Sequence, residues 1–90
     1  MAKIQYTDSY IKCAKKFITK HPELIGQYEK TLKLLELNPY HPSLRLHRLK
    51  GHLSGIYSVS INISYRITLE FIIQEDVIIP IHVGSHQEVY

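Results

Sequence analysis

One arginine, Arg66, stands in the last forty residues of the 90-residue chain, in a segment where polar and apolar residues alternate. A guanidinium group is always charged, and its fork of donors fits the oxygens of a phosphate. The chain also contains six histidines, and imidazole exchanges protons near neutral pH. These residue types predict an anion site, most simply for a phosphate, with proton carriers beside it. An ion pair between Arg66 and Glu70 is the alternative interpretation.

Two of the histidines, His82 and His86, lie four residues apart, a spacing that suits a metal ion on a helix. Gly84 between them and the strand-like pattern before them argue against a helix, and neither a cysteine pair nor a carboxylate completes a ligand set. We therefore expect no metal. His47 lies beside a predicted turn and is either a solvated loop residue or part of a site.

The single cysteine, Cys13, cannot form an internal disulfide, which agrees with a reducing compartment. It lies one position from the apolar stripe of a predicted helix, so we expect a small, half-buried residue rather than a nucleophile. Tyr90 has no evident packing role and can stack on a base or donate its hydroxyl.

Two amphipathic helices are predicted in the first half of the chain. After a strand-like segment at 3–6, Thr7 and Asp8 are N-cap candidates, and apolar residues then recur at helical spacing. Pro22 suits the first turn of a second helix with its own apolar stripe. The tyrosines expected in the core beneath these helices are Tyr6, Tyr10 and Tyr28.

Three strand-like runs follow in the second half, "IYSVSIN", "YRITLEFII" and "VIIPIHV". In the first two, every second residue is apolar, so the apolar side chains share one face of a sheet and the polar ones share the other. We expect the helices to cover the apolar face and the polar face, with Arg66, to stay open.

The net charge of +3 conceals an asymmetry between the two halves. Residues 1–50 carry ten lysines and arginines against four acids, a balance of +6, whereas residues 51–90 carry one against four, a balance of −3. A basic half can attract a phosphate backbone or an acidic protein, although the lysines also fit solvated helix faces. No run approaches the roughly 20 apolar residues of a membrane helix, and the N-terminus lacks a signal-peptide core. We expect a cytoplasmic protein without a membrane partner.

Three short motifs carry a resemblance to a known family: Leu49-Lys50-Gly51, Tyr65-Arg66-Ile67 and the closing "VGSHQEVY". Because these motifs follow one another in this order, the chain resembles RelE/ParE-superfamily toxins of bacterial type II toxin–antitoxin modules, especially the RelE and YafQ type. The resemblance implies one α+β domain over residues 1–90. It has a short N-terminal strand and a two-helix hairpin packed on one face of a mainly antiparallel sheet of four to five strands.

The resemblance also implies an activity and partners. RelE-type members are ribosome-dependent endoribonucleases (mRNA interferases) that cut mRNA in the ribosomal A site and need no metal or cofactor. The ribose 2′-hydroxyl attacks the adjacent phosphate, which requires a base, an acid and positive charge at the phosphate. A cognate antitoxin, mRNA and the ribosome are the expected partners, and the oligomeric state is left open.

The residues matched to the catalytic positions of the family are His47, Arg66, His86 and Tyr90. Arg66 matches the arginine that stabilises the phosphate, His86 and His47 match YafQ-type histidines, and Tyr90 matches a functional aromatic. The basic residues expected to bind RNA are Lys15, Lys16, Lys30, Lys33 and Lys50. Gly84 is expected to let the chain turn off the sheet, bringing His86 and Tyr90 beside Arg66.

Serines mark the departures from the family pattern. Ser58 and Ser60 stand where RelE has two lysines, and Ser60 and Ser64 stand where YafQ has a histidine and an aspartate. Two alternatives therefore stay open: a non-nucleolytic ParE-type toxin that inhibits DNA gyrase, or a catalytically weakened member that mainly binds its antitoxin.

Overall fold

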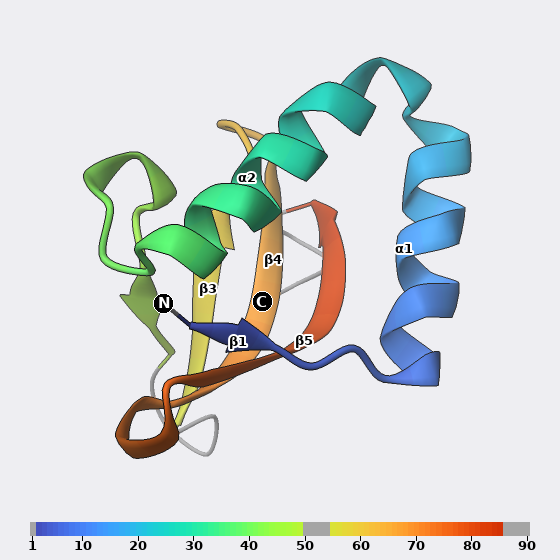
Figure 1. The fold of residues 1–90 in the computed structure, drawn as a ribbon. Coiled ribbons are helices and arrows are strands. Elements are labelled where there is room, and N and C mark those ends of the chain that lie inside the picture. The colour runs from blue at the N-terminus through green and yellow to red at the C-terminus, as the bar shows by residue number, and fades with distance from the viewer. Residues whose placement is uncertain (1, 50–54, 86–90) are drawn as a thin grey trace.

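The computed structural model describes residues 2–49 and 55–85. Its helices and turns are α1 (Asp8–Lys20), η1 (Pro22–Leu24), α2 (Ile25–Leu37), η2 (Pro42–Leu44) and η4 (Ile73–Glu75). Its strands are β1 (Lys3–Ile4), β2 (His47–Arg48), β3 (Ile56–Ser60), β4 (Tyr65–Ile72) and β5 (Val77–Ser85). Two helices packed against one sheet make an α+β fold, as the sequence predicts (Figure 1).

The five strands form one sheet in the order β1-β5-β4-β3-β2. Only β1 lies parallel to its neighbour, where Lys3 pairs with Val77, and the other pairs are antiparallel. A register shift between Thr68 and Leu69 leaves one extra residue, Ile81, on the β5 side. The shift is a β-bulge, which bends the strand that carries the extra residue. The expected antiparallel sheet of four to five strands is confirmed.

Local sequence signals fix the start of α1 but not that of α2. The Thr7 side chain accepts a hydrogen bond from the backbone N–H of Tyr10 at 3.1 Å and caps α1. Pro22 opens η1 rather than α2, so the second helix begins three residues later than predicted, at Ile25. The first turn of such a helix accommodates a proline because the backbone N–H groups there have no acceptor within the helix, so the N–H that proline lacks is not missed.

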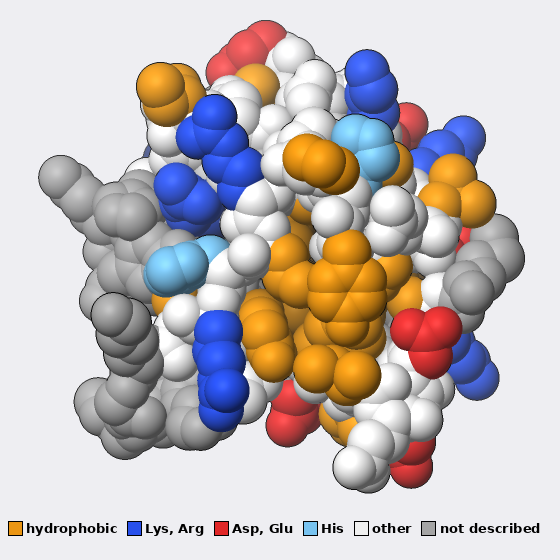
Figure 2. Space-filling view, turned by 90° about the vertical axis from the view of Figure 1, so that its left-hand side faces the viewer, with side chains coloured by type: hydrophobic (Ala, Val, Ile, Leu, Met, Phe, Trp, Pro, Cys, Tyr) orange, Lys and Arg blue, Asp and Glu red, His pale blue; other side chains and the backbone are white. Residues whose placement is uncertain are grey.

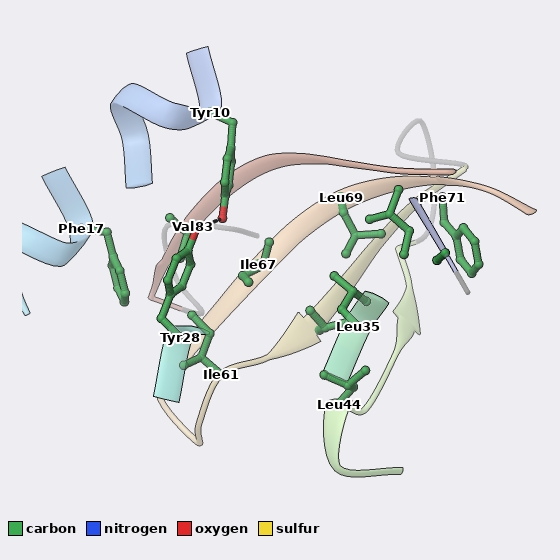
Figure 3. Close-up of a cluster of buried hydrophobic side chains, with 13 residues drawn as sticks. Tyr10, Phe17, Tyr28, Leu35, Leu44, Ile61, Ile67, Leu69, Phe71 and Val83 are labelled. Carbon is green, nitrogen blue, oxygen red and sulfur yellow. Dashed lines mark hydrogen bonds between the residues drawn. The ribbon is translucent and has the colours of Figure 1, made fainter. Parts of the chain in front are cut away.

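The core lies between the helices and the apolar face of the sheet, as Figure 3 shows. Side chains from α1 and α2 meet side chains from the strands, and the most completely buried include Tyr10, Leu35, Ile67 and Leu69. The predicted apolar face of β3 and β4 is confirmed. Tyr6 does not join this core: it is 48% exposed, because it precedes the cap of α1 and stacks on Tyr10 from outside at 6.2 Å.

The core reaches the surface at the end of α2. Figure 2 shows hydrophobic side chains gathered on the side of the molecule that carries η2. There Leu37 is 63% and Tyr40 is 61% exposed, and the Tyr40 ring lies 5.9 Å from that of Phe71. In the described parts of the chain, no helix combines the length and the apolar character needed to cross a membrane.

Candidate functional site

The polar face of the sheet is ordered by strand register. His47 on β2 pairs with Ser58 on β3, Ser58 pairs with Thr68 on β4, and Thr68 pairs with His82 on β5. Directly paired residues of neighbouring strands project from the same face. The four side chains therefore form one row across the sheet, roughly 14 Å long, with a histidine at each end.

A second row contains Arg66. Ser60 on β3 pairs with Arg66, and Arg66 pairs with Gly84 on β5. The Arg66 Nη1 donates a hydrogen bond to Ser60 Oγ at 2.9 Å. Gly84 has no side chain, so the residue of β5 paired with Arg66 places none beside the guanidinium. Ser60, one of the serines that replace charged residues of relatives, thus holds the guanidinium in place.

His47 belongs to the sheet rather than to a solvated loop. It lies on β2, it is exposed, and its register places it on the same face as Arg66. Of the four residues predicted to be catalytic, His47 and Arg66 are therefore brought onto one face. His86 and Tyr90 lie outside the described residues, as does Lys50.

Gly84 does not turn the chain off the sheet, which corrects the prediction. It is a buried, paired residue inside β5, and the ladder continues to Ser85 opposite Tyr65. A glycine in a strand interior often marks a place where another group approaches the backbone closely. Here the group beside it is Arg66.

The polar face is less open than expected. Ser58 is completely buried and Thr68 is 7% exposed, whereas Ser60 and Arg66 are partly exposed. A ligand can therefore reach the row with Arg66 and the exposed His47, but not Ser58 or Thr68 between the two histidines. The inner row of hydroxyl groups lies in a drier environment, where electrostatic interactions are stronger.

The sequence did not identify His82 and Thr68 as site residues. His82 Nδ1 lies 3.3 Å from Cys13 Sγ on α1, and the Cys13 thiol also donates to the backbone oxygen of Val83 at 3.5 Å. His82 Nε2 and Thr68 Oγ1 are buried and have no hydrogen-bond partner among the described residues. Unpartnered buried polar atoms are uncommon and often mark functional places. The available signal was that His82 is the one polar side chain in the otherwise apolar run "VIIPIHV".

The lysines predicted to bind RNA do not form one surface. Lys16 lines a groove between α1 and β5, whereas Lys15 lines a different groove between α1 and α2. Lys30 and Lys33 are exposed on α2. Lys15 and Lys16 separate because successive residues of a helix point about 100° apart.

The strongest pKa perturbations lie in the core. The Tyr10 and Tyr28 hydroxyls are 2.7 Å apart beneath the helices. Burial raises the pKa of Tyr10 far above its usual range, and the neighbouring Tyr28 raises it further. Burial also raises the pKa of Tyr28, against the hydrogen bond from Tyr10, which lowers it. Within residues 2–49 and 55–85, no three His, Cys, Asp or Glu side chains are grouped to hold a metal ion.

Comparison with known proteins gives matches among solved structures. No family model and no curated protein matches the chain. YafQ from E. coli is 14% identical, with 100% of this chain and 99% of that chain covered and a TM-score of 0.79. The YafQ of the E. coli DinJ–YafQ toxin–antitoxin complex is 16% identical, with 99% and 97% covered and a TM-score of 0.78. The YoeB–YefM complex from Staphylococcus aureus gives 20% identity, 96% and 98% coverage and a TM-score of 0.72.

These likenesses extend over nearly the whole length of both chains. They show that the chain has the fold of RelE-like toxins, which confirms the fold expected from the sequence motifs. Because a fold hosts several activities, the activity must be argued from the polar face itself.

Proposed function

We propose that this chain is the toxin of a toxin–antitoxin module and acts as a ribosome-dependent mRNA endoribonuclease. The observation that carries the proposal is the position of Arg66. It is a partly exposed cation on the polar face, held by Ser60 at 2.9 Å, with His47 on the same face. That arrangement supplies a phosphate clamp and a proton carrier on the fold of RelE-like toxins.

The reaction requires two proton transfers around one phosphate. The ribose 2′-oxygen bonds to phosphorus as its proton passes to a base, and the bond from phosphorus to the 5′-oxygen breaks. An acid protonates the leaving oxygen, so the products are a cyclic phosphate and a free 5′-hydroxyl. Arg66 would stabilise the extra negative charge on the phosphate. His47 and His86 would be the proton carriers, and Tyr90 would stack on or donate to the substrate.

Ser58 and Ser60 reduce the positive charge expected near the phosphate. Relatives with lysines at these positions place more positive charge at the phosphate, whereas here Arg66 is positioned by a neutral hydroxyl. The catalytic contribution of Arg66 should therefore be large, because fewer neighbouring cations share its role. Binding of ribosomal RNA by Lys15, Lys16, Lys30, Lys33 and Lys50 would bring the site to the codon.

The antitoxin would occupy the groove between α1 and α2. This groove encloses about 590 Å³, and its lining is mainly apolar, with Tyr10, Ala14 and Ile18 from α1 and Leu32 from α2. Ile11, also in the lining, is 39% exposed. Solved neighbours of this fold are complexes with antitoxins, and an amphipathic helix is the element that fits an apolar groove. Co-expression with the product of an adjacent short reading frame should restore growth, and Ile11→Glu should escape that rescue.

Induced expression in bacteria tests the nuclease directly. Wild-type protein should arrest growth and produce new mRNA ends at translated codons, as primer extension detects them. Arg66→Gln should lose both effects. Arg45→Gln is the matched control, because Arg45 is exposed between η2 and β2 and lies off the polar face.

Other outcomes select the alternatives. Undiminished mRNA cleavage by Arg66→Gln would contradict the proposal. Growth arrest with loss of DNA supercoiling and without mRNA cuts would indicate a gyrase inhibitor. A wild-type protein that causes no arrest but binds its antitoxin would be the catalytically weakened member.

A further inference from the structure

The groove between α1 and β5 has a chemistry of its own. It encloses about 710 Å³, a size typical of ligand sites, and Figure 1 shows α1 standing beside the C-terminal half of β5. Lys12, Lys16 and Lys20 line it. Residues four apart lie on the same side of a helix, so the three ammonium groups form a row about 12 Å long at 1.5 Å per residue.

The lining also contains an aromatic cluster at the C-terminal end of α1. The His21 and Tyr65 rings are 4.7 Å apart, and Phe17 packs against both at 5.0 Å and 5.3 Å. His21 and Tyr65 are partly exposed, so their faces can receive a flat ring, whereas Phe17 is 6% exposed and supports them. Within the described parts of the chain, the groove lining contains no carboxylate. Cations beside aromatic faces are the combination by which proteins bind single-stranded nucleic acid.

His82 connects this groove to the face that bears Arg66. By register it lies in the polar row, opposite Thr68 and two residues from Gly84. Its side chain also lines the groove, where it meets Cys13 at 3.3 Å. His82 therefore belongs both to the polar row and to the lining of the groove, so the two surfaces meet at this residue of β5.

We propose that the α1–β5 groove binds single-stranded RNA on one flank of the phosphate held by Arg66. The lysine row contacts the RNA backbone, and a base stacks on Tyr65 and His21. The inference rests on the proposed function, since it names the path of the substrate leading away from that site. It also makes Lys12 and Lys20 RNA-binding residues, although the sequence did not single them out. Lys16 then contacts the substrate RNA rather than ribosomal RNA.

Binding of an uncleavable RNA by the purified chain, without ribosomes, tests the groove separately from the chemistry. The probe is a fluorescein-labelled single strand of about ten nucleotides, within the usual range of site sizes, with 2′-O-methyl riboses that cannot attack the phosphate. Fluorescence anisotropy should show that the triple variant Lys12→Gln, Lys16→Gln, Lys20→Gln binds at least 10-fold more weakly than wild type. The slope of log affinity against log salt should become shallower by about 2, at about 0.7 per phosphate contact.

The matched control removes the same charge elsewhere. The variant Lys3→Gln, Arg45→Gln, Arg48→Gln changes three exposed cations outside the groove lining, and its affinity for the probe should fall by less than about 3-fold. Tyr65→Leu should weaken binding by about 5-fold or more through lost stacking, and the matching RNA duplex should bind at least about 10-fold more weakly than the single strand. Equal losses in the two triple variants, or equal affinity for duplex and single strand, would overturn the inference in favour of general electrostatic attraction.

Cys13 reports on occupancy because it is the single cysteine and lines the groove. Saturating probe should slow its alkylation by iodoacetamide several-fold, as mass spectrometry measures it, and an unchanged rate would place the RNA elsewhere. These results are distinct from those of the cleavage test. If Arg66→Gln loses cleavage but the Lys12, Lys16 and Lys20 triple variant binds the probe normally, only the groove inference is refuted. If Arg66→Gln cleaves normally but the triple variant loses probe binding, only the nuclease proposal is refuted.

Discussion

The two sides of the sheet differ in whether their buried polar atoms have hydrogen-bond partners. On the helix side, the Tyr10 and Tyr28 hydroxyls bond to each other at 2.7 Å, and Thr31 Oγ1 donates to the Gln27 carbonyl at 2.8 Å. On the opposite side, Thr68 Oγ1 and His82 Nε2 are buried with no partner among the residues that the structure describes. Packed cores satisfy their polar atoms, and violations of that rule concentrate at functional places. The contrast therefore supports the polar side as the working surface of the molecule.

The largest effect should come from the helix side. Leu69 is completely buried beneath the helices, and Leu69→Ala should lower the free energy of unfolding by about 2–5 kcal/mol through lost burial and the cavity that remains. Urea unfolding followed by circular dichroism measures the change. Ile81→Ala, at a 45% exposed position of β5, should change stability by less than about 1 kcal/mol. Similar losses in both variants would remove the distinction between the sides.

Arg66→Gln, on the same strand as Leu69 but on the polar side, should lower activity without lowering stability. We expect about a 100- to 1,000-fold loss of mRNA cleavage on isolated ribosomes, because one charge-stabilising donor typically contributes that much. Unfolding stability should change by less than about 1 kcal/mol, since Arg66 is only partly buried. A variant that loses activity only because it unfolds in the assay would contradict this separation of roles.

The Tyr10–Tyr28 pair should make stability depend on alkaline pH. Burial raises the pKa of both hydroxyls above the value of about 10 in the unfolded chain, so above that pH the unfolded state releases protons that the folded state keeps. Stability should be fully present below about pH 10 and fall as pH rises further. Tyr10→Phe should reduce this fall above about pH 10, measured by urea unfolding at each pH.

The smallest expected effect has the opposite sign. Thr68→Val removes a buried hydroxyl without a described partner and keeps the side-chain shape, so stability should rise by about 1 kcal/mol. Thr31→Val removes a paired hydroxyl on the helix side and should lower stability by about 1 kcal/mol. A loss in Thr68→Val would mean that its hydroxyl has a partner in solution.

The sequence predicted the two faces because alternation in β3 and β4 has the same period as the strand itself. Thr7 and Asp8 were both predicted as possible caps of α1, and Thr7 is the residue that caps it. Alternation does not give the register between strands, and the bulge beside Thr68 shifts β5 by one residue. For that reason the sequence alone does not place His82 in the row with His47.

The two grooves of α1 illustrate a signal that the sequence did contain. Lys12, Lys16 and Lys20 are spaced four apart, which puts them on one side of the helix, but the predicted RNA-binding set contains only Lys16 of the three. What spacing could not supply was the partner across the groove. Tyr65 and His82 come from strands more than forty residues away in the chain.

The parallel pairing of β1 with β5 also determines when the molecule can be assembled. Lys3 pairs with Val77 and Ile4 with Ile78, so this part of the sheet closes a loop of more than seventy residues. Contacts between such distant segments slow folding, because the chain loses loop entropy before they form. During synthesis, Arg66 on β4 leaves the ribosome before β5, the strand whose Gly84 pairs with it. A nascent chain therefore acquires the row of Ser60, Arg66 and Gly84 only after β5 has been made.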